Sequence, residues 1–277
     1  MKQNEFDLEE KYKLYRTVKE LLHPTISKRN ISNYKIVVDE HLLLLRVFYP
    51  KKVSNIHDVI LFVPGEGDIT ECEGQYSDIS SYLSKELDKM VISIDYEKAA
   101  NDLEQLLDRI FQTISFIYAQ LIKEGLSVDN IHIMGDSTGA NLLLNTIEKM
   151  NEADIHFGKM ILFYPVLSGE YSGKTNYNSI VENTSVNFNL VSKLKDYYQG
   201  CKKEFFPLAN DHKVEYPKTL LLSGNGDPLI DEAKDFAAKN ESVEIKIVDF
   251  AYHGFLNTKD KEIIKEYLEF LIDFLNQ

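Results

Sequence analysis

IHIMGDSTGANLLLNTIEKM, residues 131–150, places a short apolar strand, a turn with two glycines and a helix in direct succession. The turn, Gly135 to Gly139, has the pattern G-x-S-x-G with Ser137 at its centre. A sharp turn from strand to helix strains the backbone at the serine, and small residues two positions away on either side relieve the crowding. The turn also puts the backbone N–H of Thr138 at a helix N-terminus, where negative charge is stabilised. Alone, this pattern fits a nucleophilic serine and an ordinary glycine-rich turn equally well.

Two polar residues further along the chain complete the order that a serine nucleophile requires. A serine hydroxyl is a weak nucleophile and needs a general base close by. Asp227 lies in SGNGDP after the predicted strand 219–222, and His253 lies in AYHGF after the predicted strand 243–250. Because ligands bind at the carboxyl edge of a parallel sheet, we expect both side chains to meet Ser137 there. Alone, Asp227 is interpreted as a turn residue and His253 as a surface histidine. Catalysis is indicated because both follow strands and come after Ser137 in the expected order.

Apolar runs on both sides of this region predict alternating strands and helices. Further strands are expected at residues 34–38, 42–49, 59–63, 90–94 and 160–164. Helices with an apolar stripe are expected at residues 103–121 and 263–275. Strands separated by helices of this length imply an α/β fold with a doubly wound, mostly parallel sheet. The first strands follow one another without helices between them, so we expect them to be antiparallel at one edge.

One long segment interrupts the alternation. Residues 168–206 have little strand pattern and contain many Asn, Ser and aromatic residues. Loops of this length inside a compact domain are usually lids or functional insertions. An amphipathic helix is predicted at residues 7–22. We therefore expect a single domain over residues 1–277, with cap elements at about residues 1–30 and 168–206.

Composition and charge exclude several classes of partner. The 277 residues include 31 Lys and Arg against 44 Asp and Glu, which gives a formal net charge of −13. This excess repels nucleic acid phosphates and anionic lipid, so we expect neither as a partner. Cys72 and Cys201 are too few for a disulfide scaffold and lack the spacing of a metal site. No secretory signal or membrane span is visible, so a cytoplasmic protein is expected.

These motifs together resemble the hormone-sensitive-lipase-like esterases of the α/β-hydrolase superfamily. The elbow GDSTG is similar to the GDSAG of that family, DPLIDE at residues 227–232 to its DPLxDE, and HGF at residues 253–255 to its HGF. Weaker similarity lies in Asp95-Tyr96 and in Phe206-Pro207-Leu208. The resemblance covers about residues 57–255. It implies an α/β-hydrolase fold with a helical cap and ester hydrolysis without a metal or an organic cofactor.

The chain departs from that family in the loop that supplies backbone N–H groups to the oxyanion. Where the family has HGGG, residues 64–67 read PGEG. The resemblance implies an oxyanion hole formed by the N–H groups of Glu66, Gly67 and Thr138. A carboxylate that pointed into this hole would oppose the negative charge that the hole stabilises. Thr138 also replaces a smaller residue of the family and is expected to narrow the elbow.

The function that the resemblance implies is a serine carboxylesterase of the acetyl esterase type. A cap over the strand ends would restrict access, so we expect small esters with short acyl chains as substrates. Ser137 would attack the ester carbonyl, His253 would move the proton, and Asp227 would orient the imidazole. Asp231 and Glu232 are alternative acids, although their positions predict the first turn of a helix. Two other functions stay open: a hydrolase-fold protein that binds a small molecule without catalysis, and a serine peptidase of the same superfamily. A homodimer also stays open.

Overall fold

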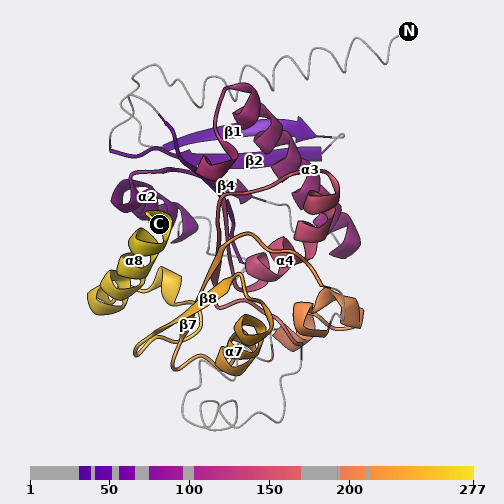
Figure 1. Cartoon of the computed structure of the whole chain (residues 1–277), viewed down its shortest axis with the longest axis vertical. Helices are drawn as coiled ribbons and strands as arrows, with labels where there is room; N and C mark the ends of the chain where they lie inside the picture. The colour runs from indigo at the N-terminus through magenta and orange to yellow at the C-terminus, as the bar shows by residue number, and fades with distance from the viewer. Residues whose placement is uncertain are drawn as a thin grey trace.

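Eight strands form one sheet in the computed structural model, which describes residues 31–38, 41–51, 56–65, 75–95, 103–169, 192, 194–209 and 213–277 (Figure 1). The strands are β1 Ile31–Val38, β2 His41–Phe48, β3 Val59–Val63, β4 Met90–Asp95, β5 Ile131–Asp136, β6 Met160–Phe163, β7 Thr219–Gly224 and β8 Val243–Val248. Their spatial order is β1-β2-β4-β3-β5-β6-β7-β8.

The directions of the strands confirm the predicted fold class. From β4 through β8 in the spatial order, every neighbouring pair is parallel. At the other edge, β2 is antiparallel to both β1 and β4. The sheet is therefore mostly parallel with an antiparallel N-terminal edge, and the carboxyl ends of β5, β7 and β8 lie at one rim of the sheet.

Helices cover both faces of this sheet. They are α2 Gln75–Leu87, α3 Leu103–Lys123, α4 Ser137–Glu152, α7 Ile230–Lys239 and α8 Lys261–Leu275. Figure 1 shows α2 and α8 on one side and α3 and α4 on the other. Buried residues of α3, α4 and α7 belong to one hydrophobic cluster, and those of α2 and α8 belong to another. The sheet separates the two clusters, as in a doubly wound α/β fold.

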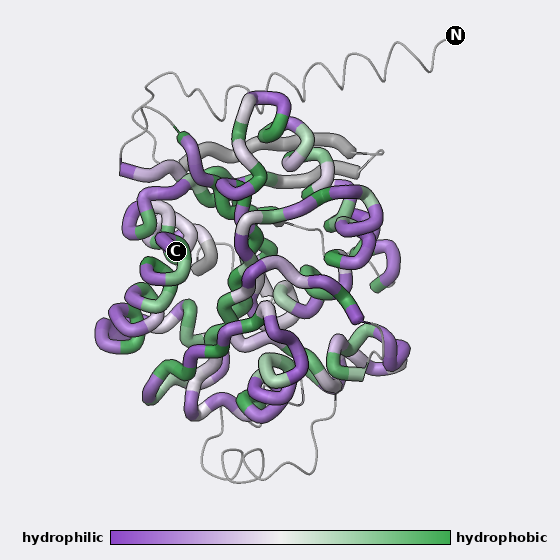
Figure 2. Tube along the Cα trace, viewed as in Figure 1, coloured by the Kyte–Doolittle hydropathy of each residue, from purple (hydrophilic) through white to green (hydrophobic). Residues whose placement is uncertain are grey.

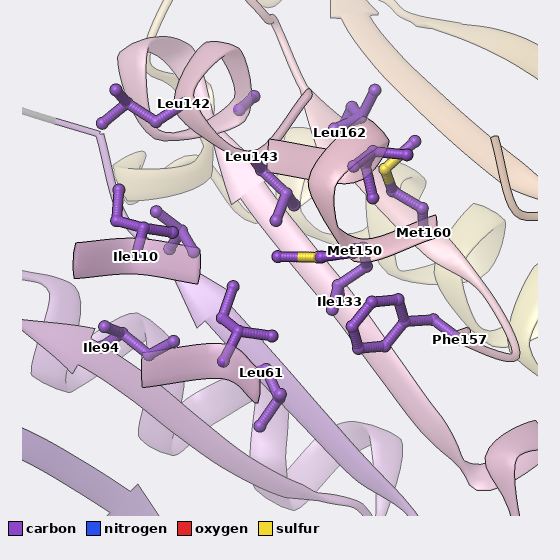
Figure 3. Packing of buried hydrophobic residues seen from close by; sticks show 14 of the residues in the cluster. Leu61, Ile94, Ile110, Ile133, Leu142, Leu143, Met150, Phe157, Met160 and Leu162 are labelled. Atoms are coloured by element: carbon purple, nitrogen blue, oxygen red, sulfur yellow. The ribbon is translucent and has the colours of Figure 1, made fainter. Parts of the chain in front are cut away.

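The larger cluster fixes the helix that carries Ser137. Figure 3 shows Leu143 and Met150 of α4 close to Ile133 of β5, and Leu142 and Leu61 belong to the same cluster. All five side chains are fully buried. Burial of one such side chain stabilises the fold by roughly 1.5–3 kcal/mol. Figure 2 shows hydrophobic residues gathered along the central strands, so the elbow after β5 rests on apolar packing.

For two of the predicted strands that end at a different residue in the structure, backbone geometry gives the reason. β6 ends at Phe163, because Tyr164 has φ of 37° and cannot continue a strand. β8 ends at Val248, and Phe250 has φ of 55°. Short 3₁₀ turns lie at η1 Val128–Asn130, η2 Lys203–Phe205, η3 Pro207–Ala209 and η4 Phe255–Asn257.

Several predictions concern residues outside the described part of the chain. These are the helix at residues 7–22, the cap element at residues 1–30, residues 170–191 of the second cap element, and Glu66 and Gly67 of the oxyanion loop. Within the described residues, no helix combines the length and the apolar character needed to cross a bilayer.

Candidate active site

Ser137 occupies a strained turn between β5 and α4. Its φ is 50°, in the left-handed region that residues with a side chain rarely adopt. Gly139 permits this turn, because a Cβ at that position would lie 2.3 Å from the backbone oxygen of Val63. The helix begins at Ser137, three residues before the predicted start at Ala140. This geometry holds the hydroxyl group at the rim of the sheet.

His253 and Asp227 approach Ser137 from two other loops at the same rim. Ser137 Oγ lies 2.9 Å from His253 Nε2, and His253 Nδ1 lies 3.0 Å from Asp227 Oδ2 and 3.2 Å from Oδ1. The side chain of His253 is 7% exposed and that of Asp227 is fully buried. With the proton on Nδ1, the ring donates to Asp227 and leaves Nε2 to accept from the serine hydroxyl. The structure thus brings together the three residues that the sequence singles out.

The loops that carry Asp227 and His253 are fixed to each other. The N–H of Gly226 donates to the carbonyl of Ala251 over 2.9 Å. Gly224 lies so close that a Cβ there would be 2.2 Å from the same carbonyl oxygen. The carboxyl group of Asp227 also accepts the N–H of Leu229 at 2.8 Å, which fixes its orientation. Backbone contacts therefore set the distance between acid and base.

The described part of the oxyanion loop is held against the elbow. The N–H of Gly65 donates to Asp136 Oδ1 over 2.7 Å, and a Cβ at Gly65 would lie 3.1 Å from Ser137 Cβ. Thr138 is buried at the start of α4, with its backbone in the first turn. Of the three predicted oxyanion residues, the structure therefore places Thr138 beside Ser137. The sequence does not predict that Gly65 donates to Asp136; the glycine spacing of PGEG is its one signal at this position.

Neither alternative acid contacts His253 among the described hydrogen bonds. Asp231 and Glu232 both lie in the first turn of α7, as predicted. Glu232 is buried and accepts the N–H of Leu167 at 2.8 Å and the hydroxyl of Ser168. It therefore anchors the chain where the segment at 168–206 begins. Burial raises the pKa of Glu232 to about 7, because an ionised carboxyl group is poorly solvated there.

This raised pKa predicts how stability depends on pH. The folded state binds the proton of Glu232 more tightly than the unfolded chain does, whose ordinary value is 4.5. Protonated Glu232 therefore contributes up to about 3 kcal/mol to the free energy of unfolding. This stabilisation is fully present below pH 4.5 and is lost as the pH rises toward 7. Urea unfolding between these limits should therefore show a steeper loss of stability in the wild type than in Glu232→Gln. Glu262→Gln, at an exposed position in the first turn of α8, is the control and should keep the wild-type slope. Equal slopes in all three proteins would contradict the prediction.

A second histidine pair lies at the opposite end of the strands. His132 Nε2 lies 3.3 Å from Asp58 Oδ1, and Lys89 Nζ lies 3.0 Å from Oδ2. The hydrogen bond from His132 and the ion pair with Lys89 lower the pKa of Asp58 to about 2. Among the described residues, no serine or cysteine forms a hydrogen bond with His132 or Asp58. We therefore interpret this pair as a structural contact and not as a catalytic one. Among the described residues, no group of three or more His, Cys, Asp or Glu side chains is arranged to hold a metal ion.

Described residues of the second cap element pack beside the acid loop. Leu194, Tyr198 and Phe206 form a buried apolar cluster with Val166 and with Leu229, two residues after Asp227. Asn141 of α4 donates to the carbonyls of Val166 and Phe205, at 2.9 and 3.0 Å. These contacts fix both ends of the segment near the elbow.

Comparisons with known proteins identify the family and the fold. A family model described as alpha/beta hydrolase fold matches residues 64–257. An esterase from Acinetobacter venetianus is 25% identical over 182 residues, which span 63% of this chain and 58% of that protein. An arylesterase from Saccharolobus solfataricus is 22% identical over 246 residues, 86% of this chain and 80% of that protein.

Solved structures show the same fold. The thermostable carboxylesterase EstE1, cloned from a metagenomic library, superposes with a TM-score of 0.75 and 21% identity over 95% of this chain and 96% of its own. An arylesterase structure gives a TM-score of 0.72 with 20% identity, over 95% of this chain and 90% of its own. The match to the Acinetobacter esterase spans less than two thirds of that protein.

Proposed function

Because the chain belongs to the alpha/beta hydrolase fold family, we propose that it is a serine carboxylesterase with Ser137, His253 and Asp227 as its catalytic residues. The observation that carries this proposal is the hydrogen-bonded path from Ser137 Oγ through the imidazole of His253 to the buried carboxyl group of Asp227. The esterase and arylesterase relatives support the same reaction class.

The geometry supports a two-step acyl transfer. Nε2 of His253 takes the hydroxyl proton as Ser137 Oγ attacks the ester carbonyl, and Asp227 stabilises the imidazolium that forms. The imidazolium then returns the proton to the leaving alcohol, which departs and leaves an acyl group on Ser137. Water, deprotonated by the same imidazole, attacks the acyl group, and the imidazolium returns the proton to Ser137 Oγ as the carboxylic acid leaves. Apart from the ester and water, the groups named in these steps belong to the chain itself.

The oxyanion that forms in each step needs N–H donors. We assign this role to the backbone N–H groups of Thr138, Glu66 and Gly67. Support comes from Gly65, which Asp136 holds beside Ser137 directly before these residues. Donors that are already in place stabilise the transition state without reorganisation.

The substrates that we propose are small esters with short acyl chains. Support comes from the apolar cluster of Leu194, Tyr198 and Phe206, which fills space beside the acid loop. The acidic composition also disfavours anionic lipid surfaces. We expect kcat/KM for p-nitrophenyl esters to be highest for acetate or butyrate and to fall for laurate and palmitate. A preference for the long chains that strengthens above their micellar concentration would contradict this substrate class.

A covalent probe separates this function from the two alternatives. A fluorophosphonate should modify Ser137 with one probe per chain, as peptide mass spectrometry would show, and should leave Ser137→Ala unmodified. Absence of labelling together with absence of hydrolysis would favour a silent binding protein. Faster cleavage of short peptide amides than of the matched esters would favour a peptidase.

A further inference from the structure

Tyr164 lies between His253 and Asp136, the residue that binds Gly65 of the oxyanion loop. Its backbone conformation is explained neither by the fold nor by the proposed triad. It follows β6 directly, is 1% exposed, and has φ of 37°. A bulky residue with positive φ is an outlier that persists only where the surroundings impose it. The N–H of Tyr164 donates to the carbonyl of Leu222 in β7 over 2.7 Å, which fixes its backbone at the rim.

The ring of Tyr164 packs on the imidazole. The centroids of Tyr164 and His253 are 4.7 Å apart, with the ring planes tilted by 55°. Phe255 holds the tyrosine ring in an edge-to-face contact, with centroids 5.0 Å apart. The ring therefore limits the rotation of His253 away from Ser137 Oγ.

The hydroxyl of Tyr164 reaches the other half of the site. It donates to Asp136 Oδ2 over 3.3 Å, while Oδ1 of the same carboxyl group accepts the N–H of Gly65 over 2.7 Å. Both groups are buried, so the two hydrogen bonds do not compete with bulk water. Through Asp136, Tyr164 is linked to the loop that lies against Ser137.

We propose that Tyr164 is a positioning residue that couples the two halves of the site. Its ring holds the imidazole of His253, and its hydroxyl, through Asp136, holds Gly65 beside Ser137. This inference rests on the proposed esterase function. A shift of the oxyanion loop relative to His253 would reduce the stabilisation of the transition state more than the affinity for the substrate. The reason is that the oxyanion exists only after Ser137 has attacked the ester carbonyl.

Tyr164→Phe tests the coupling, because it keeps the ring and removes only the hydroxyl. We expect kcat for a short p-nitrophenyl ester to fall roughly 3- to 15-fold, as for the loss of one hydrogen bond, with KM unchanged. Tyr267→Phe is the matched control. Tyr267 is fully buried in the same aromatic cluster, 6.0 Å from Phe255, and its hydroxyl has no hydrogen-bond partner among the described residues. This control should keep the wild-type kcat.

Amide exchange at Gly65, followed by NMR, gives a second readout that needs no substrate. Exchange should be faster in Tyr164→Phe than in the wild type and in Tyr267→Phe, since the carboxyl group of Asp136 loses one of its donors. Wild-type kcat and wild-type exchange in Tyr164→Phe would overturn the coupling, as would equal losses of kcat in both variants. Absence of ester hydrolysis in the wild type, with faster exchange in Tyr164→Phe, would instead refute the esterase function and leave the coupling standing.

Discussion

Replacement of Ser137 by Ala is expected to lower kcat for a short p-nitrophenyl ester by roughly 10⁴-fold or more, because no other group can form the acyl intermediate. The fold should survive, since alanine fits wherever serine does and keeps the same backbone. The measurement is steady-state hydrolysis, with the unfolding midpoint in urea as a check on folding. His253 should remain in place, held by Asp227 at 3.0 Å.

The control for this variant is Ser223→Ala. Ser223 lies near the end of β7, at the same rim, and is fully buried. Its hydroxyl has no hydrogen-bond partner among the described residues. Its removal should leave kcat unchanged. Substantial hydrolysis by Ser137→Ala, beyond what traces of wild-type enzyme explain, would exclude Ser137 as the nucleophile.

Asp227→Asn is expected to lower kcat by roughly 10⁴-fold while the protein stays folded. An amide has nearly the same shape as a carboxyl group, and its oxygen can still accept the N–H of Leu229. It cannot stabilise the imidazolium of His253, and its NH₂ group favours the tautomer with the proton on Nε2. That tautomer cannot accept the proton of Ser137. The loss should therefore appear in kcat and in the rate of fluorophosphonate labelling.

Asp231→Asn is the matched control, because Asp231 is the other aspartate of the DPLIDE segment and lies in the first turn of α7. We expect its kcat to stay within about twofold of the wild type, because Asp231 makes no described hydrogen bond to His253 or Ser137. A large loss in Asp231→Asn with little loss in Asp227→Asn would show that the acid is misassigned.

The sequence predicts the elements of the fold and the order of the triad because both depend on local patterns. The G-x-S-x-G turn requires a strand before it and a helix after it, and both are present at β5 and α4. Asp227 and His253 follow strands, and a parallel sheet brings the ends of its strands to one rim. The antiparallel edge could be predicted because no helix separates the first strands.

The contacts that hold the site together could not be predicted in the same way. Glu232 is correctly expected in the first turn of a helix, but its inward direction depends on Leu167, 65 residues earlier in the chain. Residues 160–164 read as one apolar strand, and nothing local shows that Tyr164 leaves the strand and turns toward Asp136. The pairing of Gly65 with Asp136 joins residues 71 positions apart. Such contacts depend on how whole elements pack.

The left-handed backbone of Ser137 has a consequence for evolution and engineering. A residue with a side chain in this region is less favourable than glycine by roughly 1–2 kcal/mol. Under the proposed function, Ser137→Gly is therefore expected to raise the free energy of unfolding and to abolish ester hydrolysis. Selection for thermal robustness alone would drive this position away from serine. A serine that is kept at this position lowers the stability of the fold, and in return its hydroxyl oxygen is held at the rim of the sheet.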